Sequence, residues 1–165
     1  MSESPAWVRR FGWFVTGAMA ICLMAGHASA QIFATCVADN GQRVRVPVYL
    51  SHTGDIARSR AAPISRIFID PAFQRLSPAA QHLILSHECH HAVHTYINED
   101  QADVYAGKLM YLGGYSRDVT MKAAREVMSR GTTSGHSDPA VRIASIMRGF
   151  DEAAADSKNR PRHSD

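Results

Sequence analysis

Five consecutive residues, His87-Glu88-Cys89-His90-His91, have the types and the spacing needed for metal-dependent hydrolysis. Residues four apart lie on the same face of a helix, so His87 and His91 can offer their imidazoles to one ion. Glu88 lies about 100° round the helix, where it can reach a water molecule rather than the metal. Zinc would activate that water, and Glu88 would take its proton and pass it to the leaving amine. The segment therefore predicts a peptidase centre with one Zn²⁺ per chain.

A catalytic zinc site needs a third protein ligand, and two carboxylates downstream are candidates. The metzincin pattern requires a histidine six residues after His91, but that position is Ile97. Glu99 and Asp103 remain, spaced so that they share a face of the next predicted helix. If Glu99 binds the ion, Asp103 can hydrogen-bond the other nitrogen of a ligand histidine. An aspzincin-like site would instead use Asp103 and leave Glu99 idle. His90 and His94 are expected to be solvent-facing neighbours.

Two helices must carry these residues. Ser77, followed by a proline, is an N-cap and predicts a helix over residues 78–94. Asn98 is the next N-cap, and the helix that it starts ends at a Gly-Gly pair, residues 113–114. On one unbroken helix Glu99 would lie about 12 Å along the axis from His91, too far to share an ion. The chain must therefore turn sharply between His94 and Asn98.

The remaining segments predict an α+β domain that is mainly helical. Alternating apolar residues predict a strand at 44–50, and Pro47 marks it as an edge or interrupted strand. Residues 51–63 are expected to form a loop, followed by a second short strand at 64–69. A third helix is predicted over residues 117–130, and a fourth after the cap-plus-proline pair Asp138-Pro139.

The first thirty residues have the composition of a secretory signal peptide. Arg9 and Arg10 precede an uncharged apolar run, and Ala28-Ser29-Ala30 supplies the small residues of a cleavage site. The apolar run of roughly sixteen residues is short for a retained membrane anchor, so cleavage after Ala30 and a periplasmic location are predicted. The expected organisation is a signal peptide at 1–30, a peptidase domain at 31–155 and a disordered polar tail at 156–165.

The distribution of charge and the two cysteines after residue 30 bear on the expected partners and compartment. Removal of residues 1–30 lowers the formal charge of +3 to about +2, because two arginines and one glutamate leave. The sequence contains no basic stripe with interleaved aromatic residues, so no nucleic-acid partner is expected. Cys36 and Cys89 could pair in an oxidising compartment, but the position of Cys89 within a predicted helix favours a small buried apolar residue.

Several pieces of the chain stand in the order found in one peptidase family. They are residues 67–69, 83–91, 99–103, 113–116, 136–139 and 142–143. With these pieces the chain resembles the HtpX-like gluzincin zinc metallopeptidases, the group that includes the CAAX prenyl endopeptidases and small periplasmic relatives. Residues 67–69 correspond in that comparison to the edge strand before the active-site helix.

The resemblance implies a minimal gluzincin (zincin-like) domain with a small N-terminal edge sheet and about four helices. It implies His87, His91 and Glu99 as the metal ligands, with Asp103 supporting them. It also implies two catalytic residues, Glu88 as general base and His136 on a loop near the metal or the transition-state oxyanion.

The predicted function is that of an exported zinc metalloendopeptidase acting on peptides or proteins. By family analogy its role would lie in quality control of envelope proteins, with an envelope protein as partner. The alternative is a catalytically inactive zinc-binding or adaptor protein that keeps the fold. Retention of Glu88 favours the enzyme, because zinc binding alone does not need it.

Overall fold

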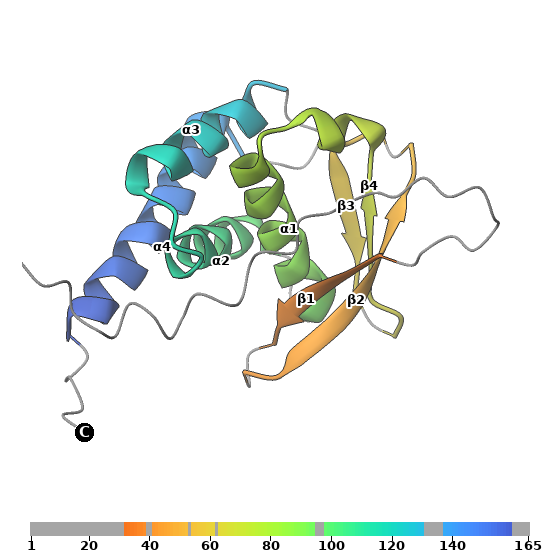
Figure 1. The fold of residues 1–165 in the computed structure, drawn as a ribbon, viewed down its shortest axis with the longest axis horizontal. Coiled ribbons are helices and arrows are strands. Elements are labelled where there is room, and N and C mark those ends of the chain that lie inside the picture. The colour runs from red at the N-terminus through yellow and green to blue at the C-terminus, as the bar shows by residue number, and fades with distance from the viewer. Residues whose placement is uncertain are drawn as a thin grey trace, which may run out of the picture. The chain divides into compact units, whose positions relative to one another are not determined.

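The computed structural model describes residues 32–38, 41–52, 54–61, 63–94, 98–130 and 137–159. These residues form the α+β, mainly helical fold expected from the sequence (Figure 1). The elements in this part of the chain are β1 (Ile32–Val37), β2 (Arg43–Leu50), β3 (Ala57–Arg60), β4 (Arg66–Ile69), the 3₁₀ helix η2 (Pro71–Arg75), α1 (Pro78–Val93), α2 (Glu99–Leu112), α3 (Arg117–Met128) and α4 (Pro139–Asn159).

The four described strands form one sheet in the order β1-β2-β4-β3. β2 runs antiparallel to β1 and parallel to β4, and β3 pairs antiparallel with β4. Alternate side chains of a strand point to opposite faces, and the buried ones, Val46, Val48, Ile67 and Ile69, belong to one face. That face packs against α1, which lies between the sheet and the other helices (Figure 1).

The strand predictions were partly wrong. β2 and β4 are interior strands of the described sheet, and β3 forms one of its edges within the expected loop. Pro47 is tolerated because β2 pairs with β4 only from Val48 onward, so its missing N–H costs no bond in that ladder. β1 was not predicted, and β4 begins at Arg66 rather than at residue 64.

A disulfide joins Cys36 of β1 to Cys89 of α1, with Cα atoms 5.2 Å apart. The interpretation of Cys89 as an unpaired apolar residue is therefore wrong. The two cysteines lie 53 residues apart in sequence and meet only because the sheet packs on α1. The bond fixes β1 to the part of α1 that lies between His87 and His91.

α2 and α4 make the closest helix contact through two glycines. A Cβ atom on Gly107 of α2 would lie 1.9 Å from the carbonyl oxygen of Ile146, and one on Gly149 of α4 would lie 1.9 Å from that of Val104. Only glycine fits at such a distance. The contact holds the first turn of α2 against the second and third turns of α4, where the Asp100 carboxylate accepts hydrogen bonds from Ser145 and Arg148.

The ordered domain extends further toward the C-terminus than the sequence predicts. α4 extends to Asn159, so the first residues of the tail predicted to be disordered are helical. The predicted signal peptide at 1–30 lies outside the described residues and stays a prediction, while residues 31–165 form a compact unit of their own. Among the described helices, none combines the length and apolar character needed to cross a membrane.

Candidate metal centre

α1 presents His87 and His91 on one face, as their spacing predicts. The helix begins at the N-cap Ser77, whose hydroxyl accepts a hydrogen bond from the Ala80 N–H, and ends at Val93. The two rings meet edge to face with centroids 4.8 Å apart, and their Nε2 atoms lie 3.1 Å from each other. Both Nε2 atoms therefore point at the same small region of space.

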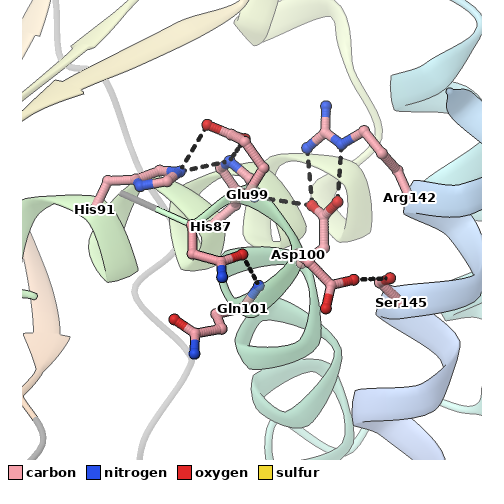
Figure 2. A network of polar contacts seen from close by, with 9 residues as sticks. His87, His91, Glu99, Asp100, Gln101, Arg142 and Ser145 are labelled. Atoms are coloured by element: carbon pink, nitrogen blue, oxygen red, sulfur yellow. Dashed lines mark hydrogen bonds and ion pairs between the residues drawn. The ribbon is translucent and has the colours of Figure 1, made fainter. Parts of the chain in front are cut away.

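α2 supplies a carboxylate to this region. Asn98 caps the helix by accepting a hydrogen bond from the Gln101 N–H, as expected from the sequence, and Glu99 stands in the first turn. The Glu99 carboxylate oxygens lie 3.2 Å from His87 Nε2 and 3.3 Å from His91 Nε2 (Figure 2). The break between α1 and α2 that the metal-site hypothesis requires is thus present.

His87, His91 and Glu99 form a group that could hold a metal ion. The His87 and His91 Nε2 atoms lie 3.1 Å apart, and they contact different oxygens of the Glu99 carboxylate, Oε2 over 3.2 Å and Oε1 over 3.3 Å. One ligand atom from each of the three residues lies within 4.8 Å of the others, which is close enough for all three to bind a single ion.

Asp103 lies on the other side of the His87 ring. His87 Nδ1 donates a hydrogen bond of 2.9 Å to Asp103 Oδ1. This bond keeps a proton on Nδ1, so Nε2 is the nitrogen that would bind an ion after releasing its own proton. Orienting a ligand histidine in this way is the usual supporting role of such a carboxylate. Of the two carboxylates considered, Glu99 is the one beside the histidine Nε2 atoms.

Arg142, in the first turn of α4, is a site residue that the sequence analysis did not identify. Its Nε and Nη2 donate to the two oxygens of Asp103, each over 2.8 Å (Figure 2). A signal was available, because Asp103 stands between Ala102 and Ala106, both buried, on the apolar face of α2. A carboxylate there needs a cationic partner.

The charges of the cluster stabilise one another. Burial alone would lower the pKa of His87, but hydrogen bonds to Asp103 and Glu99 and the nearby Glu88 charge raise it to about 9. Burial would raise the pKa of Glu99, but its contacts with His87 and His91 hold that pKa well below its usual range. Burial would also raise the pKa of Asp103, but its hydrogen bonds with Arg142 and His87 lower that pKa instead. Glu99 and Asp103 are therefore ionised at neutral pH and His87 is protonated in the metal-free chain, so a bound ion would have to displace the His87 proton.

Glu88 follows His87 on α1 and is only 9% exposed. It lines a cavity of about 80 Å³ together with His87 and Arg142, and the rest of the wall is largely apolar, including Leu83 and Ile146. Glu88 does not belong to the metal-binding group among the described residues. Its charge nevertheless acts on the neighbouring His87, whose pKa it helps to raise.

Two neighbouring histidines are more buried than the sequence predicts. His90 and His94 are half-buried rather than solvent-facing, because their rings pack against Tyr105, with centroids 5.3 and 5.9 Å from its ring. They are not part of the metal-binding group found among the described residues. His136, predicted to be catalytic, lies outside the described residues.

Comparisons with protein-family models, with curated proteins and with solved structures found no match for this chain.

Proposed function

We propose that this chain is an exported zinc-dependent endopeptidase of the HtpX-like gluzincin type. One observation carries the proposal. The Nε2 atoms of His87 and His91 and the carboxylate of Glu99 lie close enough together to hold one ion, and Glu88, which is not part of this group, shares a cavity wall with His87. Two imidazoles and one carboxylate suit zinc, and three protein ligands with an open position are typical of catalytic rather than structural sites.

Zinc bound there would lower the pKa of a water molecule and polarise the scissile carbonyl. The chain's own groups supply the remaining steps. Asp103 orients His87 through Nδ1, and Arg142 keeps Asp103 in place. Glu88 accepts the proton of the attacking water and delivers it to the leaving amine.

The surroundings suggest the kind of substrate. The cavity beside Glu88 is small and mainly apolar, which favours a peptide with an apolar side chain next to the scissile bond. The Cys36–Cys89 disulfide supports an oxidising compartment such as the periplasm. On the family resemblance alone, His136 is proposed to act on the oxyanion, and envelope proteins are proposed as substrates or partners.

The alternative is a zinc-binding or adaptor protein without catalysis. The low exposure of Glu88 and the small cavity beside it favour this alternative, because they leave little room for a substrate. Peptide hydrolysis requires Glu88 as the general base, whereas zinc binding alone does not require it.

Glu88→Gln separates the two. The peptidase proposal expects Glu88→Gln to keep its zinc, measured by elemental analysis, and to lose casein cleavage by at least about a hundredfold. Glu152→Gln, which removes a surface carboxylate of α4 paired with Lys108, is the matched control and should cleave normally. A wild-type protein that binds zinc but cleaves no unfolded substrate would support the adaptor instead.

A further inference from the structure

The side of the sheet that faces away from α1 carries a pattern not visible in the linear sequence. In β2 the buried residues are even-numbered, so Arg43, Arg45 and Tyr49 point outward. The strand registers bring further cationic and aromatic residues to the same face. This outer sheet face consists of Phe33, Arg43, Arg45, Tyr49, Arg58, Arg60, Arg66 and Phe68.

The outer sheet face concentrates the positive charge of the chain after residue 30. Residues 71–165 contain eleven Lys and Arg and eleven Asp and Glu, so they are balanced. Residues 31–70 contain five arginines, all on this face, against three aspartates. Of these aspartates, Asp55 pairs with Arg58 over 2.7 Å. The net charge of +2 expected after cleavage therefore belongs to the sheet.

The aromatic rings of this face are already covered by side chains of the same face. The Arg45 guanidinium lies 4.2 Å from the centre of the Phe33 ring. Tyr49 and Phe68 stack on each other with centroids 5.7 Å apart and an interplanar angle of 28°. A nucleic-acid base would need an open ring face for stacking, so this arrangement disfavours single-stranded nucleic acid.

Two rings of the outer sheet face still reach solvent. Phe33 is 37% exposed and Tyr49 is 36% exposed. Arginines matched to phosphate and aromatic rings at headgroup depth are features of a peripheral membrane-binding surface.

We propose that the outer sheet face docks this protein on a membrane rich in anionic phospholipids. The metal centre would stay accessible, because His87 and His91 face α2, whereas Cys89 faces the sheet through its disulfide. Docking would hold the peptidase beside the membrane without using the catalytic residues. The arginines and aromatic rings of this face come together across strands, so they form no basic stripe in the linear sequence.

Sedimentation with lipid vesicles tests the proposal. Residues 31–165 are used, since they form a compact unit of their own. The probes are phosphatidylglycerol–phosphatidylcholine vesicles, pure phosphatidylcholine vesicles and a single-stranded oligonucleotide.

The triple variant Arg43→Gln, Arg45→Gln, Arg60→Gln removes three charges from the outer sheet face. Lys122→Gln, Arg125→Gln, Arg130→Gln removes three charges from exposed positions of α3 and of the turn that follows it, and is the α3 control.

The wild type and the α3 control should bind the anionic vesicles and release them in about 0.5 M salt. The sheet variant should bind about fivefold more weakly per arginine, on the order of a hundredfold in total. Phe33→Ser should also weaken binding while leaving zinc content unchanged. Absence of vesicle binding by the wild type, equal loss in both triple variants, or binding of the oligonucleotide in place of vesicles would overturn the proposal.

Discussion

Arg142 of α4 holds both carboxylate oxygens of Asp103 of α2, and the same carboxylate accepts a hydrogen bond from the metal-facing His87. Asp103 is 2% exposed. The chain thus connects its fourth helix to the candidate metal centre through one buried carboxylate. This relationship makes the packing of α4 on α2 a condition for the orientation of His87.

Removing the cation should show how much the site depends on it. Arg142→Leu leaves Asp103 buried without its guanidinium, and the free energy of unfolding should fall by about 3–5 kcal/mol. Zinc affinity of the folded variant should fall about 10- to 100-fold, because His87 loses its fixed orientation. Urea denaturation and zinc titration measure the two effects. Arg148→Leu removes an exposed arginine of the same helix and should cost about 1 kcal/mol or less. Equal effects of both substitutions would contradict this role for Arg142.

The α2–α4 contact should not tolerate a methyl group. Gly107→Ala brings a Cβ into the backbone of Ile146, so the helices must separate, at a cost of about 3 kcal/mol or more. At Gly113, where the nearest atom would lie 3.1 Å away, alanine should cost about 1 kcal/mol or less. Urea denaturation of both variants tests the contact, and a fully stable Gly107→Ala would show that the helices are not this close.

The disulfide should contribute substantially to stability. Cys36 and Cys89 close a loop of 53 residues, for which loop-closure entropy gives about 4 kcal/mol. The double variant Cys36→Ser, Cys89→Ser should lose roughly that amount in urea denaturation. A reductant should bring the wild type to the same level and leave the double variant unchanged. Two free thiols in the unreduced exported protein would rule the bond out.

The start of α1 should be sensitive to acid. The Ser77 hydroxyl and N–H donate to Glu126 over 2.6 and 2.9 Å, and these bonds hold the pKa of Glu126 below its usual value of 4.5. The stabilisation is therefore complete above that pH and is lost as the pH falls through the lowered pKa. Glu126→Gln should cost about 1 kcal/mol at pH 7, since the pair is near the surface. Thermal unfolding should show no such difference near pH 3, and an equal penalty at both pH values would refute the ionic contribution.

Features that depend on neighbouring residues could be predicted from the sequence. Ser77, Asn98 and Asp138 cap their helices because a short side-chain oxygen reaches an N–H two or three residues on. His87 and His91 share a face because of the helical period alone. The sharp break before Asn98 followed from distance, since Glu99 could not otherwise reach the two histidines.

Features that depend on distant residues could not be predicted in the same way. The strand order puts β2 inside the sheet, whereas Pro47 on its own suggests an edge. The Cys36–Cys89 bond and the Arg142–Asp103 pair exist because helices and sheet pack together. The outer sheet face is assembled from alternate residues of four strands, which no single window of sequence reveals.

Zinc content paired with activity tests the central claim most directly. Residues 31–165, purified at neutral pH, should contain one zinc ion per chain by elemental analysis and should cleave casein. A chelator should remove the zinc and the cleavage together, and added zinc should restore both. Glu99→Ala should prevent zinc binding, because it removes one of the three residues of the metal-binding group. Absence of zinc from the purified protein at neutral pH, or cleavage that persists after the metal is removed, would contradict the account.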